Sequence, residues 1–178
     1  MGDIKVHPPV KMICAVTFQR DFPLETALKE LEKLISRVQQ KSEIFEFDFT
    51  TYYEPEMGSG LLKQMLGFEG LFPVEILPDI KVATNELELK LSRQAARKIN
   101  LDPGYLTAAK LVLATTKDYD HRLYLGRGIF GDVHLRFRQK HFLPNEWTYP
   151  DYRQPEILRF FEEVRAQYMQ ELAEFAAK

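Results

Sequence analysis

The spacing of apolar residues switches repeatedly between the strand and helix periods along this chain, and these switches constrain the fold more than any other feature. Residues 10–18 form an apolar run rich in Val, Ile and Phe, as expected for a buried strand. Apolar residues recur at helical spacing over 24–38, where Asp21 is placed to cap the helix. Phenylalanines alternate with acids over 45–49, and 61–68 indicates a further strand. The predicted order is strand, helix, strand, strand.

The same switching continues toward the C-terminus. Residues 76–91 predict a second amphipathic helix, and 110–116 a central strand. Between them, the Asn-Leu-Asp-Pro-Gly-Tyr run at 100–105 predicts a type II turn, because proline presets φ and glycine supplies a positive φ. Residues 121–138 predict a β-hairpin that turns at Gly-Arg-Gly, and a helix is expected to begin near Pro155.

The order of these elements defines the expected fold class. Strand, helix, strand, strand, helix and strand in succession are typical of a split βαβ unit. We therefore predict an α+β fold, namely a ferredoxin-like βαββαβ sandwich with an added β-hairpin and a C-terminal helix. A chain of 178 residues is most simply one domain, with a core at about 8–118, the hairpin at about 121–140 and the last helix at about 155–177.

Composition excludes several classes of protein. A formal net charge of −2 gives no global field for a phosphate backbone or an anionic membrane, so nucleic acid is not an expected partner. The longest apolar runs are far shorter than the ~20 residues of a membrane helix, and the first residues lack the pattern of a signal peptide. The single cysteine, Cys14, lies in an apolar run and suits a reducing compartment. We therefore expect a cytoplasmic protein.

Two patterns resemble nucleotide-binding motifs without their structural context. Residues 126–131 fit G-x-G-x-x-G, but the alternating residues that follow predict a strand, whereas dinucleotide binding needs a helix there. Thr116-Lys117-Asp118 is similar to a guanine-reading motif, but Tyr119 stands where that motif has its aspartate. No G-x-x-x-x-G-K-[ST] loop occurs in the sequence, so we exclude a P-loop GTPase.

The strand predicted after these glycines places Asp132, His134, Arg136 and Arg138 on one face. Such a face could bind phosphate, including RNA. Alternatively, it could simply be solvated, or its charges could pair with the acids of 45–49 across the sheet. The second interpretation is favoured, because the aromatic residue of this strand lies on the opposite face and cannot stack on bases.

Acidic residues of the predicted loops are candidates for acid–base catalysis or for binding a hard cation. The four histidines lack zinc-binding spacing and one cysteine excludes a thiolate zinc site. Mg²⁺ remains a candidate cofactor, because it often needs only one or two carboxylates beside substrate phosphates, and Asp132 is a further candidate ligand for it. Turn formation, capping or solvation explains the same acids without any function. The candidate catalytic residues are Glu54, Glu56, Asp102 and Asp151.

Basic and aromatic residues of the same loops suggest a ligand site. An Arg fork beside Lys and His donors suits phosphate or carboxylate, and Tyr or Trp rings can stack on a planar ligand. Loop-capping salt bridges, or a strap that docks the last helix, are the alternatives. Lys81 and Asn85 lie one helical turn apart on the flank of an apolar stripe, facing either solvent or a ligand. The candidate ligand-binding residues are Tyr53, Lys117, His121, Arg122, Tyr149 and Arg153.

Two runs are specific enough to indicate relatives: Asn-Leu-Asp-Pro-Gly-Tyr at 100–105 and Trp-Thr-Tyr-Pro-Asp-Tyr-Arg at 147–153. With shorter matches at 9–11 and 47–58, at Lys81 and elsewhere, they make nearly the whole chain resemble the bacterial family catalogued as domain of unknown function 4416. The resemblance implies no established activity. Some members of that family are labelled GTP-binding, which no GTPase motif of this sequence supports.

The candidate residues lead to one functional expectation and one alternative. We expect the loops to form a polar, aromatic-lined cleft for a small anionic or nucleotide-like ligand, and the sequence leaves catalysis open. The alternative is a noncatalytic interaction or dimerisation module, because Tyr, Trp and Arg are also the hot-spot residues of protein interfaces. A homodimer is thus an open alternative.

Overall fold

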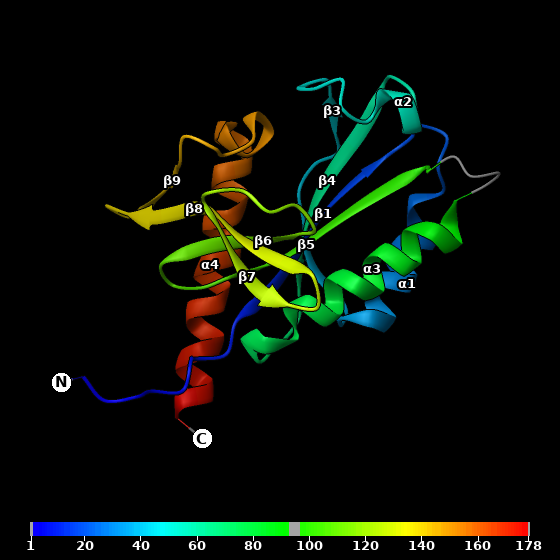
Figure 1. The fold of residues 1–178 in the computed structure, drawn as a ribbon. Coiled ribbons are helices and arrows are strands. Elements are labelled where there is room, and N and C mark those ends of the chain that lie inside the picture. The colour runs from blue at the N-terminus through cyan, green and yellow to red at the C-terminus, as the bar shows by residue number, and fades with distance from the viewer. Residues whose placement is uncertain (1, 93–96, 178) are drawn as a thin grey trace.

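The computed structural model describes residues 2–92 and 97–177, and within them the chain folds into a nine-strand antiparallel sheet with helices on both faces (Figure 1). This architecture confirms the predicted α+β class. The strands are β1 (Lys11–Phe18), β2 (Val38–Lys41), β3 (Phe45–Phe47), β4 (Leu61–Phe68), β5 (Ile99–Leu106), β6 (Lys110–Thr115), β7 (Arg122–Gly126), β8 (Ile129–Arg138) and β9 (His141–Pro144). The helices are α1 (Leu24–Leu34), α2 (Glu54–Met57), α3 (Leu77–Leu91) and α4 (Pro155–Ala176), with short 3-10 turns η1 (Val74–Ile76) and η2 (Pro150–Arg153).

Both edges of the sheet are built from short strands that lie on a longer one. The strand order is β2-β4-β1-β5-β6-β8-β7, with β3 on β4 and β9 on β8. β2 and β3 pair with opposite ends of β4, and β7 and β9 pair with opposite ends of β8. The hairpin formed by β7 and β8 and the terminal helix α4 confirm two of the predicted elements.

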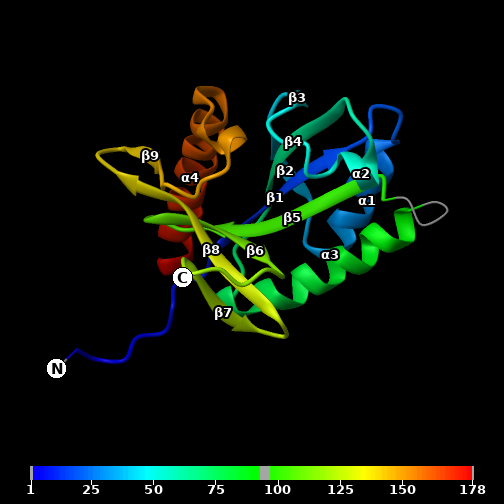
Figure 2. The same ribbon diagram turned by 45° about the horizontal axis from the view of Figure 1, so that its top comes forward.

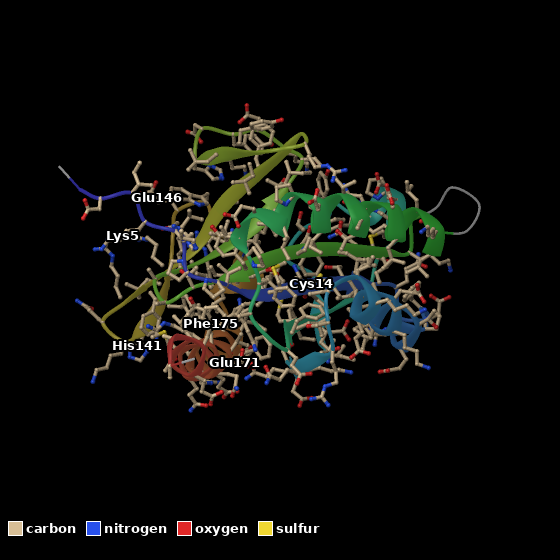
Figure 3. All side chains as sticks on the ribbon, turned by 90° about the horizontal axis from the view of Figure 1, so that it is seen from below. Lys5, Cys14, His141, Glu146, Glu171 and Phe175 are labelled. Atoms are coloured by element: carbon tan, nitrogen blue, oxygen red, sulfur yellow. The ribbon has the colours of Figure 1, made fainter. Side chains whose placement is uncertain are left out.

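Alternating side chains of β1 enter two different cores, as expected for a strand covered on both faces. Met12, Cys14 and Val16 pack with α1 and α3. Ile13 and Ala15 pack with α4 on the other face. Figure 2 shows α4 on one side of the strands and α1 with α3 on the other, and Figure 3 places Cys14 near the middle of the molecule. The apolar run of β1 therefore holds the two layers together.

The predicted turn at residues 100–105 is wrong, because these residues belong to β5. β5 pairs with β1 along its whole length, from Ile99 opposite Phe18 to Leu106 opposite Lys11. On its other side it pairs with β6 only from Gly104 onward, and Pro103, which has no N–H to donate, stands where that pairing stops. A Cβ on Gly104 would lie 2.3 Å from the carbonyl oxygen of Val112, so only glycine allows this close approach.

Two boundaries in the first third of the chain also differ from the prediction. α1 ends at Leu34, and Val38 begins β2 instead of continuing the helix. Asp21 makes no capping hydrogen bond to α1 and instead lies 3.8 Å from Lys98. Val38 continues the helical spacing of α1, but its pairing with β4 places it in a strand. This is a tertiary effect that local spacing cannot predict.

The predicted basic face of β8 is wrong, because β8 contains a bulge. Leu135 pairs with Leu111, whereas Val133 pairs with Val112, so one extra residue, His134, interrupts the alternation. Asp132 and His134 are both buried, and the acids at 46 and 48 are not their partners: Glu46 pairs with Arg20 instead. Asp132 and His134, which were predicted to share an accessible face with Arg136 and Arg138, therefore point into the interior of the protein.

Candidate functional site

A cleft of about 660 Å³ opens on the N-terminal side of Gly104 in β5, where β5 and β6 are no longer paired. Residues from α2, α3, β5, β6 and β8 line it, together with the segments that precede α2 and η2. Its charged lining residues are Glu56, Lys81, Glu88, Arg97, Asp102, Lys117 and Asp132. Its uncharged polar and aromatic lining residues include Tyr52, Tyr53, Asn85, Asn100, Thr115, Thr116 and Tyr149.

One polar face of α3 supplies three of these residues. Lys81, Asn85 and Glu88 are spaced four and three residues apart, so they share one face of the helix. Lys81 is buried and its Nζ donates a hydrogen bond to the Leu101 carbonyl oxygen at 2.8 Å. The same ammonium lies 3.4 Å from Asp102 Oδ1. Lys81 therefore connects α3 to the strand that forms the opposite wall.

Glu88 is a buried carboxylate that also connects α3 to β5. Its Oε1 accepts a hydrogen bond from the Leu101 backbone N–H at 2.6 Å, and its Oε2 accepts one from Arg97 at 3.1 Å. Burial raises the pKa of Glu88 above the ordinary glutamate value, and the positive charge of Lys81 and the Leu101 hydrogen bond only partly offset this effect. The raised pKa reflects how little water reaches this end of the cleft.

Asp102 presents its carboxylate to the open part of the cleft. Asn100 donates a hydrogen bond to Asp102 Oδ2 at 2.7 Å, and the Lys81 contact holds the other oxygen. A quarter of the Asp102 side chain is exposed, whereas Lys81 is 8% exposed. Asp102 is thus an oriented carboxylate that a ligand can reach.

Arg97 joins α2 to the wall formed by α3 and β5. Its guanidinium pairs with Glu56 at 2.7 Å and with Glu88 at 3.1 Å, and it donates to Asn100 Oδ1 at 3.0 Å. It also lies 5.7 Å from the centre of the Tyr53 ring. This network holds Glu56 and Tyr53 in the cleft.

The far wall rests on a buried network around Asp132. Arg122 Nε lies 3.1 Å from Asp132 Oδ2, and the other guanidinium nitrogens donate to the Lys117 carbonyl oxygen and the Tyr149 hydroxyl. His134 Nε2 accepts a hydrogen bond from the Tyr149 backbone N–H, so its Nδ1 carries the proton that faces Asp132 at 3.2 Å. Burial alone would raise the pKa of Asp132, but the hydrogen bonds from His134 and Arg122 and the Arg122 charge hold it below its usual range.

Lys117 is the cation of the cleft that is free to meet a ligand. Its Nζ donates a hydrogen bond to the Tyr52 hydroxyl at 2.7 Å and lies 3.9 Å from the centre of that ring. In the described parts of the chain no carboxylate lies within ion-pairing distance of it. An ammonium held by an uncharged partner keeps its full attraction for an anion.

The structure brings half of the predicted site residues together at the cleft. Lining residues are Tyr53, Glu56, Asp102, Lys117 and Tyr149. Arg122 lies behind the wall, where it orients Tyr149 and Asp132. His121 stacks on Trp147 with ring centres 4.8 Å apart, and its Nε2 lies 3.4 Å from Asp132 Oδ2.

The remaining three candidates lie outside the cleft. Asp151 is buried in an ion pair with Lys63 at 2.7 Å. Arg153 donates to the carbonyl oxygens of residues 145, 146 and 148, so its guanidinium stabilises the backbone of this segment instead of facing the cleft. Glu54 is exposed on α2, because residues 54–57 form a helical turn instead of the predicted loop, and residues two apart on a helix point in different directions.

Sequence reasoning missed Glu88 and Arg97, and it placed Asn100 in a turn. Glu88 had one available signal, its spacing of seven residues from Lys81 on the predicted helix. Arg97 had none, because its three partners come from α2, α3 and β5. Within residues 2–92 and 97–177, no three or more His, Cys, Asp or Glu side chains gather as a metal-binding group.

The fold and the cleft define an α+β protein with a polar cleft at a split in its sheet. The chain belongs to the family described as Domain of unknown function (DUF4416), whose model matches residues 8–168. This result confirms the resemblance noted in the sequence. Comparison with curated proteins and with solved structures finds no match. None of the helices in the described segments combines the length and apolarity needed to cross a bilayer.

Proposed function

We propose that this protein binds a small polar ligand with an anionic group in the cleft between β5 and β6. The observation that carries the proposal is a cleft of about 660 Å³ with an unpaired ammonium, Lys117, at one wall. That volume falls in the range of about 300–1,000 Å³ that is typical of small-molecule sites. Hydrogen bonds and ion pairs hold the other charged lining residues in place, which favours a preorganised site.

The distribution of charge supports an anion at Lys117 more than anywhere else in the cleft. Glu56 and Glu88 are paired with Arg97, Asp102 with Lys81, and Asp132 with Arg122. Because Glu56 and Glu88 share the single guanidinium of Arg97, these groups together carry one excess negative formal charge, and the attraction for an anion comes from Lys117. The ligand's anionic group is expected to lie beside the Lys117 ammonium and the Tyr52 hydroxyl.

The aromatic and amide side chains support a planar, nucleotide-like body for the ligand. Tyr53 and Tyr149 line the cleft and can cover the face of a ring. Asn85 also lines it, and among the described residues its amide makes no hydrogen bond, which leaves its NH2 group as a donor and its carbonyl oxygen as an acceptor for a ring edge. Where catalysis occurs, Asp102 is the carboxylate best placed to exchange a proton, because it is both oriented and accessible. Mg²⁺ would enter as a partner of a ligand phosphate.

The finer fold assignment also belongs to this proposal. We infer a ferredoxin-like unit within the larger sheet, formed by β1, α1, β2, β4, α3 and β5. The order β2-β4-β1-β5 and the packing of α1 and α3 on one face of β1 support it. A buried, reduced Cys14 fits the cytoplasm as the working compartment.

Thermal melts against a panel of nucleotides, phosphorylated metabolites and nucleobases, each with and without Mg²⁺, test the function. A ligand at about 100 times its dissociation constant should stabilise the protein by about 2.7 kcal/mol, which corresponds to a rise in melting temperature of about 5–11 °C for a chain of this size. Lys117→Ala should abolish the shift. Lys90→Ala, which removes an exposed lysine on α3 that does not line the cleft, should retain it.

A flat panel would contradict the proposal and favour the noncatalytic interaction module. A shift that survives Lys117→Ala would place the ligand elsewhere. The residues expected for the interaction module are partly engaged within the chain, since Trp147 Nε1 donates to the Val133 carbonyl oxygen and the Tyr149 hydroxyl accepts from Arg122. We therefore place the small-ligand function first.

A further inference from the structure

β7 forms an outer edge of the sheet and carries three consecutive exposed apolar side chains. Leu123, Tyr124 and Leu125 are 71%, 64% and 39% exposed. Consecutive strand residues point to opposite faces, so this edge is apolar on both sides. Its outer backbone groups have no strand partner within the described residues. We propose that β7 pairs antiparallel with β7 of a second copy of this chain, joining the two sheets into one.

The opposite edge of the sheet shows how this fold protects a strand that stays unpaired. Exposed positions on β2 and β3 are Gln39, Lys41 and Glu46. Polar and charged side chains of this kind prevent edge-to-edge association. β7 carries a bulge at Leu125, next to the hairpin turn, but no charged side chain protects it, because its exposed residues are Leu, Tyr and Leu.

The rest of the edge that contains β7 is already closed by the chain itself. Between β7 and β9, the Val133 carbonyl oxygen accepts hydrogen bonds from Asn145 Nδ2 at 2.6 Å and from Trp147 Nε1 at 3.0 Å. Thr148 Oγ1 also donates to the His134 carbonyl oxygen. A partner strand therefore finds open backbone on β7 and not along the centre of β8.

A second copy fits this edge because β7 is complementary to itself. An antiparallel pair centred on Tyr124 places each Leu123 opposite the Leu125 of the other chain, which forms two equivalent apolar contacts about a two-fold axis. Asp118 and Asp120 precede β7, and Arg127, which pairs with Asp79 of the same chain, follows it. Antiparallel pairing sets the two aspartates of each strand near Arg127 of the other chain, whereas parallel pairing would bring the aspartates of the two chains together.

The proposed interface is independent of the ligand site. Leu123, Tyr124, Leu125, Asp120 and Arg127 do not line the cleft. A failure of the dimer proposal would therefore leave ligand binding untouched, and a failure of ligand binding would leave the dimer untouched.

Sedimentation or light scattering over a range of protein concentrations is the first test. We expect a concentration-dependent dimer whose dissociation constant rises at least tenfold in Leu123→Lys. Ile44→Lys, which changes an exposed apolar residue between β2 and β3, should leave the dimer intact. Melting temperatures of both variants should stay near that of the unmodified chain, because both side chains are exposed. A monomer at every concentration, or a dimer unaffected by Leu123→Lys, would overturn the proposal.

Disulfide trapping tests the register. Residues directly opposite each other in an antiparallel pair have Cα atoms about 4.5–5.5 Å apart, within the range of about 4.4–6.8 Å that a disulfide spans. Tyr124→Cys should therefore form a covalent dimer rapidly under mild oxidation, while Leu123→Cys should do so far more slowly. Cys14 is buried and gives no background. Equal trapping of both variants, or none, would contradict the two-fold pairing centred on Tyr124.

Discussion

Two lysine–aspartate pairs of this protein have the same chemistry and opposite accessibility. Lys63 and Asp151 lie 2.7 Å apart and are 3% and 2% exposed, whereas Lys81 and Asp102 lie 3.4 Å apart and are 8% and 25% exposed. The first pair is closed inside the protein, and the second opens into the cleft. Accessibility therefore distinguishes a charge pair that a ligand can contact from one that only holds the fold together.

The surroundings of the two pairs explain the difference. The Lys63 ammonium lies 4.6 Å from the centre of the Phe47 ring and 5.3 Å from that of Tyr152, so aromatic rings cover it. Its partner Asp151 lies in η2, directly before α4, and the pair fixes this segment to β4. Asp102 lies beside Pro103, where the pairing of β5 and β6 stops and leaves room for a ligand.

The largest expected effect comes from breaking the closed pair. Lys63→Met should lower the free energy of unfolding by about 3–5 kcal/mol, because it leaves the Asp151 carboxylate buried without a partner. Urea denaturation measures the loss. The double variant Lys63→Met, Asp151→Leu should recover most of it, and a loss below 1 kcal/mol in the single variant would show that the pair is dispensable.

A second variant alters the split in the sheet itself. Gly104→Ala should destabilise the protein by about 1–3 kcal/mol, because its Cβ would meet the Val112 carbonyl oxygen and push β5 from β6. Ligand-induced shifts in melting temperature should also fall, since the cleft opens at this point. Gly2→Ala, with nothing near its added Cβ, is the control. Unchanged stability would mean that β5 and β6 can move apart enough to accommodate the added Cβ without a loss in the free energy of unfolding.

Neutralising the open pair should cost much less than breaking the closed one. Asp102→Asn should lower the free energy of unfolding by about 1 kcal/mol, because the Lys81 contact is long and Asp102 is partly solvated. Binding of the ligand identified by the melts should weaken by more than this stability loss implies. Calorimetric titration and urea denaturation on the same sample check both values, and a stability loss as large as that of Lys63→Met would contradict the comparison.

The smallest effect is a change in pH dependence at the buried end of the cleft. The folded-state pKa of Glu88 is raised, so its favourable contribution is present below the ordinary glutamate pKa and is lost as pH rises through the folded value. Glu88→Gln should remove that loss, and the stability of the variant relative to the unmodified chain should therefore improve as pH rises across this interval. Urea midpoints at a series of pH values measure it. An opposite trend would mean that Glu88 is stabilised as a carboxylate by Arg97.

Local sequence patterns were sufficient to predict much of the secondary structure. They were insufficient where pairing with a strand distant in the sequence determines the conformation. The apolar run of β1 and the periodicity of α3 and α4 were predictable, because their burial follows from their own spacing. Residues 100–105 contain the composition of a turn, yet pairing with β1 makes them a strand. Likewise His134 is buried because of a bulge that only the register with β6 defines.

The candidate site was predictable residue by residue but not as an arrangement. Asp102 and Asp151 are equally plausible acids in the sequence, since each lies beside a proline and within three residues of a tyrosine. The position of Lys63, which lies 88 residues from Asp151, decides that Asp151 is enclosed. Lys117 and Tyr52, 65 residues apart, meet by the same kind of long-range packing.

Because Cys14 is buried, the rate at which its thiol can be labelled measures how often the core opens. Burial raises the pKa of this thiol far above its ordinary value, and the side chain lies in the core between β1, α1 and α3 (Figure 3). A thiol-reactive reagent can modify it only in molecules that have transiently unfolded around it, because thiolate and access are both required. The labelling rate of the unmodified chain thus reports how often the core opens, and a ligand that stabilises the folded state will slow it.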